Sequence, residues 1–284
     1  MSTEAAPPRR WTTPCSLRRA SVGKHFSCMT SIPSLFVGLL DLILMFLVVR
    51  AIFGSRAVAA AATLLLLLEP QHFVYSVKWA GNILVIPCLL GWMLGLTRYE
   101  REPRPKWIFL STMVLGLALT RDPYRAILPL LVICEGATLL FLWRLGRLRD
   151  HAAYAVTGFA IPFLAAIVLV EAQPYPLVSM IPWPQSVLST LAIAVLVWGG
   201  FIGALKGGSP IDHVIAVGFV GAIVSIWLRP KLDDGFEIVP FKILLAAVTI
   251  SWLMRSKAGR AVLLVVLTAA AVGFGQIILE IYRN

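Results

Sequence analysis

Long apolar runs separated by short polar connections occupy the chain from about residue 31 to its end. Two of these runs, 79–97 and 152–170, are 19 residues long and contain no charged residue. An α-helix needs about 20 apolar residues to cross the hydrocarbon core of a bilayer. Because hydrocarbon offers the backbone no hydrogen-bond partner, such runs must fold as helices. The pattern therefore predicts an all-α fold, a polytopic integral membrane helical bundle.

We expect about ten transmembrane helices, with a range of about eight to eleven. They are predicted at 31–49, 57–75, 79–97, 107–120, 126–143, 152–170, 186–205, 211–228, 241–254 and 261–279. The runs 107–120 and 241–254 are short, which favours helices that are either tilted into thin regions or re-entrant and broken. The second run contains Glu69-Pro70. Because proline lacks a backbone N–H, we expect that helix to end or kink there.

Composition supports one membrane domain. The chain has 284 residues, of which 59% are hydrophobic and 14% charged, whereas soluble domains carry about 25% charged residues. We predict a basic, disordered tail over residues 1–30 and a single transmembrane helical domain over 31–284. The net charge of +11 comes from bases at the ends of the apolar runs. Such bases anchor helices at anionic lipid, so we expect membrane lipid as a partner and no nucleic acid.

The connections between the runs differ in charge. Odd-numbered connections contain thirteen Lys and Arg, whereas even-numbered ones and the C-terminus contain six. The positive-inside rule places the odd connections in the cytoplasm. That assignment puts the tail outside, although it holds five bases. Either one span is wrong, or the tail is not the natural beginning of this architecture.

The sequence contains few signals of enzyme chemistry. It has no nucleotide-binding glycine motif and no His-Glu-x-x-His zinc motif. Cys88 and Cys134 lie inside apolar runs and are expected to be core residues. We predict no metal site and no cofactor. A divalent cation at Asp233 and Asp234 stays open, although two adjacent acids favour a solvated turn.

Charged residues on the predicted external side are more informative. Arg121 and Arg125 flank Asp122 between two runs, and two guanidiniums could grip a phosphate. The alternative is a charged turn that ends two helices. Lys78 either reaches the interface or contacts an anionic lipid headgroup.

Two acids, Asp41 and Glu135, lie in the middle of apolar runs. A charge in hydrocarbon is costly, so each acid needs a partner or a proton. We expect hydrogen bonds between packed helices, and ion coupling is the alternative.

Four segments resemble one family in order and spacing. They are Gly38–Asp41 continuing into Leu47–Arg56, Leu64–Ser76, Trp107–Arg121, and Arg121–Leu130. Together they resemble the GT-C type membrane glycosyltransferases that use polyprenyl phosphate, in particular the protein-mannosyltransferase-like and aminoarabinose-transferase-like branches. The resemblance covers about half of the chain, from Ser34 to Val170.

This resemblance implies sugar transfer from a polyprenyl-phosphate donor on the external face of the bacterial inner (plasma) membrane, as part of cell-envelope chemistry. Lys78, Arg121 and Arg125 would bind the donor phosphate. In the family, an acid in the first external loop acts on the acceptor, and the catalytic residue of this chain is unknown. The family also has one more helix and that acid-bearing loop before the segment beginning at Gly38. We therefore expect an N-terminally truncated member, and inactivity of the chain as written stays open.

Two other functions stay open. Asp41 and Glu135 would be the titrating groups of a proton-coupled transporter or flippase. The third possibility is a non-catalytic membrane scaffold.

Overall fold

The computed structural model describes residues 32–77, 84–120, 124–169, 187–228 and 236–283. Helices account for nearly all of these residues, and no strand occurs among them. The α-helices are α1 (Ile32–Phe53), α2 (Arg56–Leu67), α3 (Pro70–Val77), α4 (Val85–Arg101), α5 (Pro105–Leu117), α6 (Tyr124–Arg144), α7 (Leu148–Leu169), α8 (Val187–Lys206), α9 (Pro210–Trp227), α10 (Val239–Leu253) and α11 (Lys257–Arg283). Short 3-10 helices, η2 (Ala118–Thr120) and η3 (Phe236–Ile238), follow α5 and precede α10. The all-α prediction is confirmed, and the predicted tail lies outside these ranges.

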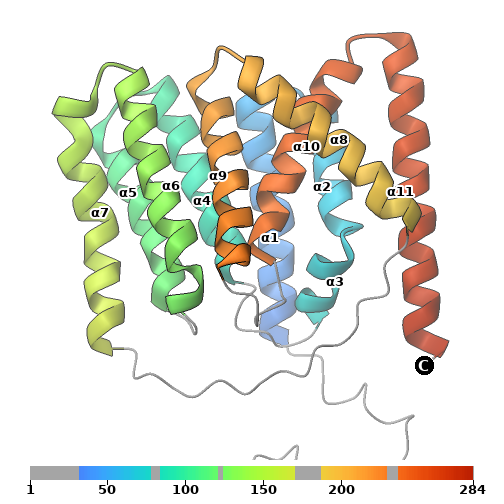
Figure 1. Cartoon of the computed structure of the whole chain (residues 1–284), viewed down its shortest axis with the longest axis horizontal. Helices are drawn as coiled ribbons and strands as arrows, with labels where there is room; N and C mark the ends of the chain where they lie inside the picture. The colour runs from blue at the N-terminus through green and yellow to red at the C-terminus, as the bar shows by residue number, and fades with distance from the viewer. Residues whose placement is uncertain (1–31, 78–83, 121–123, 170–186, 229–235, 284) are drawn as a thin grey trace, which may run out of the picture.

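The chain runs up and down between two ends of one bundle (Figure 1). Because α2 and α3 share one path, the eleven α-helices of the described ranges make ten passes, as the sequence predicts. Stretches of α1, α6, α9 and α11 are long and apolar enough to cross a membrane, and shorter apolar helices accompany them. Large apolar side chains such as Phe36, Trp198 and Leu264 are exposed on the outer surface. This surface suits hydrocarbon, so the chain is an integral membrane protein.

The second pass is interrupted where the sequence predicts a break. Helix α2 starts at a Ser55 cap, whose side chain accepts from the Val58 N–H at 3.4 Å, and it ends at Leu67. Pro70 cannot donate a backbone hydrogen bond, so it begins a new helix, α3. The Glu69 carbonyl accepts from the Phe73 N–H at 3.0 Å and starts that helix. The result is a short helix, α3, at one end of the bundle.

The two short spans are not broken. Helix α10 is uninterrupted over 15 residues, and α5 continues directly into η2. Of the two alternatives that the short runs left open, a broken helix is therefore not seen in either span, and both are short continuous helices. The long span boundaries agree with the apolar runs to within a few residues.

Small residues let several helices approach closely. A Cβ atom on Gly200 of α8 would collide with the backbone carbonyl of Leu245 in α10. A Cβ atom on Gly158 of α7 would likewise collide with Thr112 and the carbonyl of Phe109 in α5. Between apolar helices in lipid, such close packing supplies much of the association energy. These contacts help to fix the positions of α7 and α8.

One end of the bundle, which we call the basic end, holds the turns α1–α2, α4–α5, α6–α7, α8–α9 and α10–α11 (Figure 1). It carries the bases of the odd-numbered connections, namely Arg50, Arg56, Arg98, Arg101, Arg104, Lys106, Arg144, Arg147, Arg149, Lys206, Arg255, Lys257 and Arg260. The start of α1 and the end of α11 lie at the opposite end. Sequence counting and folded geometry thus assign the same residues to one side, which the positive-inside rule makes cytoplasmic.

The Gly200 contact can be tested with a matched glycine. Gly200→Ala should lower the free energy of unfolding by about 1–3 kcal/mol, because its Cβ overpacks the α8–α10 contact. Gly136→Ala is the control, since a Cβ there meets nothing within 4 Å. Thermal unfolding in detergent measures both variants. Equal midpoints for the two variants would contradict the close packing of α8 on α10.

Candidate functional site

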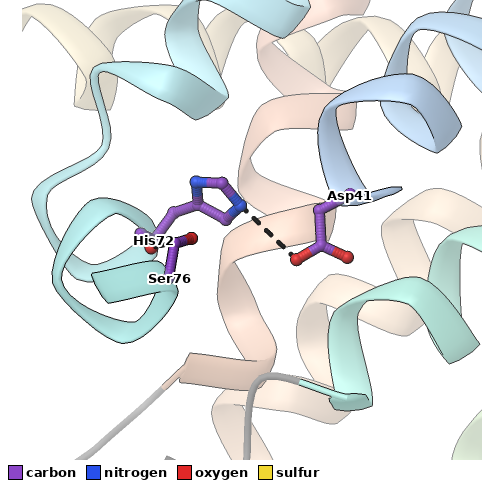
Figure 2. Close-up of polar contacts among 3 residues, drawn as sticks. All are labelled: Asp41, His72 and Ser76. Atoms are coloured by element: carbon purple, nitrogen blue, oxygen red, sulfur yellow. Dashed lines mark hydrogen bonds and ion pairs between the residues drawn. The ribbon is translucent and has the colours of Figure 1, made fainter. Parts of the chain in front are cut away.

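A buried acid–base pair joins α1 to α3 at the end opposite the basic end. The His72 Nε2 lies 3.4 Å from the Asp41 Oδ2, and the two side chains are 2% and 0% exposed. Figure 2 shows the imidazole and the carboxylate facing each other across the gap between the two helices. The acid that the sequence places in mid-span therefore has a basic partner. The contact places Asp41 against α3, but neither Asp41 oxygen has a hydrogen-bond partner among the described residues, so the expected packing hydrogen bond is not seen.

Ser76 completes the attachment of α3 to α1. Its hydroxyl donates to the carbonyl of His72, one turn earlier, at 2.7 Å. A Cβ atom on Gly38 of α1 would collide with this hydroxyl, so only glycine leaves room for Ser76. Gly38 and Asp41 lie on neighbouring turns of α1 and both contact α3. Two adjoining contacts thus hold α3 against α1.

A second buried pair joins the α2–α3 junction to α10. The Lys242 Nζ donates to the Glu69 Oε1 at 2.8 Å. The Glu69 side chain is 5% exposed and the Lys242 side chain 23%. Glu69 directly precedes α3, the helix that carries His72, so the two pairs are neighbours along the chain. We call these residues, Asp41, Glu69, His72 and Lys242, the polar layer.

Several buried atoms of the polar layer lack a hydrogen-bond partner. Both Asp41 oxygens, the Glu69 Oε2 and both His72 nitrogens have no hydrogen-bond partner among the described residues. Buried polar groups without hydrogen bonds are costly, and at Glu69 the Lys242 amine offsets part of that cost. Three of its four side chains, those of Asp41, His72 and Glu69, are no more than 5% exposed. It is therefore suited to positioning helices.

Glu135 differs from Asp41. It lies in mid-helix in α6 and is largely buried, and neither of its carboxylate oxygens has a hydrogen-bond partner within the described ranges. The expected packing hydrogen bond is not seen there.

Cys134 is buried and Cys88 half-buried, which agrees with their predicted place in the core.

The predicted phosphate ligands lie at or beyond the limits of the described ranges. Lys78 and Arg121 lie outside these ranges, and Arg125 belongs to the first turn of α6, although its side chain is not among the described ones. The helix ends beside them, Val77 and Thr120, lie at the end opposite the basic end (Figure 1). Helix α3 packs on α1 and α2, whereas η2 packs on α4 to α7. The structure thus brings the flanking elements to one end of the bundle.

The acids proposed for a cation also fall outside the described ranges, since Asp233 and Asp234 precede η3. Within those ranges, no group of three or more His, Cys, Asp or Glu could hold a metal ion.

Sequence reasoning missed Lys242. It is a lone cation in an apolar run, and Glu69 is a lone acid in another run. Each charge would be costly in hydrocarbon unless paired, so the search for a partner could have joined them. The same reasoning could have joined Asp41 to His72. Pairing of isolated charges was the available signal.

The Asp41–His72 contact can be tested by paired replacement. His72→Leu should lower the free energy of unfolding by about 1–3 kcal/mol, because it leaves a buried acid without its partner. Adding Asp41→Leu should recover most of that loss, since an apolar pair often replaces a buried polar pair without penalty. Thermal unfolding of the single and double variants in detergent gives the coupling free energy between the two positions. Additive losses in the double variant would show that the residues do not interact.

Comparison with known proteins gives one match. Residues 22–170, just over half of the chain, match the family described as dolichyl-phosphate-mannose-protein mannosyltransferase. The match contains α1 to α7, and it begins within the segment predicted to be a tail. No curated protein and no solved structure matches the chain.

Proposed function

The chain belongs to the dolichyl-phosphate-mannose-protein mannosyltransferase family, whose members are membrane glycosyltransferases, and we propose that it transfers a sugar from a polyprenyl-phosphate donor. Transfer takes place at the end opposite the basic end, on the external face of the bacterial inner membrane. The family match is the observation that carries this proposal. It covers all three residues proposed for the donor phosphate, Lys78, Arg121 and Arg125.

The setting supports a donor with a lipid tail. A polyprenyl chain needs hydrocarbon, and its phosphate needs the interface, so the reacting centre belongs at the helix ends. Val77, Thr120 and the start of α6 at Tyr124 lie at one such end (Figure 1). Lys78, Arg121 and Arg125 follow these positions by one residue each in the sequence. Arg offers a planar fork of donors that matches phosphate oxygens.

The reaction exchanges one bond for another. An acceptor atom bonds to the anomeric carbon of the sugar while the bond from that carbon to the phosphate oxygen breaks. Polyprenyl phosphate leaves with the electron pair, and cationic side chains stabilise its charge. The acceptor proton passes to a base, which in such reactions is a carboxylate within hydrogen-bond reach.

The buried acids do not fit the role of this base. Among the described residues near this end, Asp41, Glu69 and Glu237 are each no more than 5% exposed. An acceptor outside the bundle does not reach them. The base is therefore expected among the side chains that the structure does not describe, and the chain on its own is inactive if it lacks that acid.

The phosphate role of Arg121 can be measured by transfer from the lipid donor. In an active form of the protein, Arg121→Ala should reduce turnover about 10- to 100-fold, because a charge-assisted hydrogen bond contributes about 1.5–3 kcal/mol. Arg149→Ala, at an exposed site on the basic end, is the matched control and should leave turnover unchanged. Full activity of the Arg121 variant would remove this residue from the site.

One observation favours a second candidate, a proton-coupled transporter or flippase. Glu135 lies in a membrane-spanning stretch, and its oxygens have no hydrogen-bond partner among the residues that the structure describes. Acids in such positions often carry protons. Glu135→Gln should then abolish proton-coupled uptake in liposomes, while Glu102→Gln, on the exposed basic end, should not. Intact uptake with Glu135→Gln would exclude this candidate.

A further inference from the structure

We propose that Lys242 is a positioning residue for donor binding, acting through Glu69 on helix α3. This inference rests on the proposed transferase function. Glu69 lies inside the family match, whereas Lys242 lies outside it, 173 residues further along the chain. A residue from the C-terminal part, which the family match does not cover, would thereby fix the orientation of α3, which the match does cover.

The first step concerns the break between α2 and α3. Within a continuous helix, backbone hydrogen bonds fix each turn relative to the one before it. At the break, the Glu69 N–H donates to the Leu66 carbonyl at 3.2 Å, and Pro70 has no N–H to donate. The direction of α3 relative to α2 therefore depends on side-chain contacts. Glu69, at the junction, is where such a contact has the most influence.

The second step concerns what holds α3. His72 and Ser76 contact α1, and the Phe73 ring packs edge-on against Phe274 of α11, with ring centroids 5.3 Å apart.

The Lys242–Glu69 hydrogen bond of 2.8 Å adds an attachment to α10, which also packs along α2. Of these contacts, only the Lys242–Glu69 hydrogen bond acts at the junction itself, where the direction of α3 relative to α2 is set. The last residue of α3, Val77, directly precedes Lys78, so this orientation sets where the chain enters the region proposed for the donor phosphate.

The third step concerns the choice of an ion pair. Lys242 follows Phe241 and precedes Ile243 and Leu244, all of which are fully buried. A buried ion pair is often no more stabilising than apolar residues of similar volume. Stability alone therefore does not call for a lysine at this position. A charged pair does specify one arrangement of α10 against the junction, because any other arrangement leaves charges unpaired.

Lys242 is poorly placed to bind the donor directly. Its amine is engaged by Glu69, and its side chain is only 23% exposed. A positioning role predicts that a reversed pair works and that arginine substitutes for lysine. Direct phosphate binding predicts that a glutamate at position 242 abolishes donor binding.

The test uses the full chain in nanodiscs of phosphatidylethanolamine and phosphatidylglycerol. The variants are Lys242→Met, Lys242→Arg and the reversed pair Glu69→Lys with Lys242→Glu. Lys257→Met is the control, because Lys257 is an exposed lysine at the basic end. Two measurements are made on each, namely amide hydrogen exchange across residues 71–77 and the Kd for a polyprenyl-phosphate sugar donor.

Lys242→Met should speed amide exchange in α3 and raise the Kd for the donor about tenfold, because it leaves Glu69 unpaired. Lys242→Arg should behave as the wild type, the reversed pair should recover most of both properties, and Lys257→Met should change neither. Unchanged exchange in α3, or an unchanged Kd, would overturn the positioning role. If the reversed pair restores slow exchange but does not bind the donor, Lys242 is a direct ligand and the proposal is wrong. Faster exchange in Lys242→Met alongside a wild type that does not bind the donor would retain the pair's hold on α3 and overturn the proposed donor binding.

Discussion

The bilayer interior offers no partner to a polar group, and this constraint determines most of what the chain can be. Every backbone group must be satisfied within a helix, which accounts for a fold made of helices throughout the described ranges. The same constraint acts on side chains. Asp41 lies against His72 and Glu69 against Lys242, although each residue is isolated in its own apolar run. Polar side chains that are isolated in the sequence and paired in the interior therefore indicate which helices are neighbours.

The two ends of the bundle carry different kinds of polar residues. The basic end gathers cations at exposed turns, where they meet water and anionic headgroups and fix the orientation of the chain. The opposite end gathers buried pairs around α3 and the helix ends that precede the proposed donor ligands. A lipid-linked donor suits this division, because its chain lies in hydrocarbon while its phosphate stays at the interface. The family match covers α3 and the helix ends that precede the proposed donor ligands but not α10, which supplies Lys242.

The sequence predicted helix positions and helix breaks best, because the apolar membrane interior restricts the backbone at those positions. The run 126–143 became α6 (Tyr124–Arg144), and the break at Glu69-Pro70 separated α2 from α3, because apolar length and a missing N–H act locally. The pairings were not predicted, because Lys242 and Glu69 are distant in the sequence and meet only after α10 packs on α2. The short run 241–254 left a tilted and a broken helix open for a similar reason, since packing with α2 and α8 accommodates a short helix without a break. The proposed ligands Lys78 and Arg121 lie outside the described ranges, so their role stays a prediction.

The orientation of the bundle is the claim on which the external reaction depends. It can be measured by labelling single cysteines with a membrane-impermeant maleimide in intact cells, after Cys15, Cys28, Cys88 and Cys134 are replaced by alanine. Ser256→Cys lies in a turn at the basic end, and Leu228→Cys lies at the other end of α9, where both positions are exposed. The account predicts that position 228 is labelled in intact cells and position 256 only after permeabilisation. Labelling of position 256 in intact cells, with position 228 protected, would contradict it.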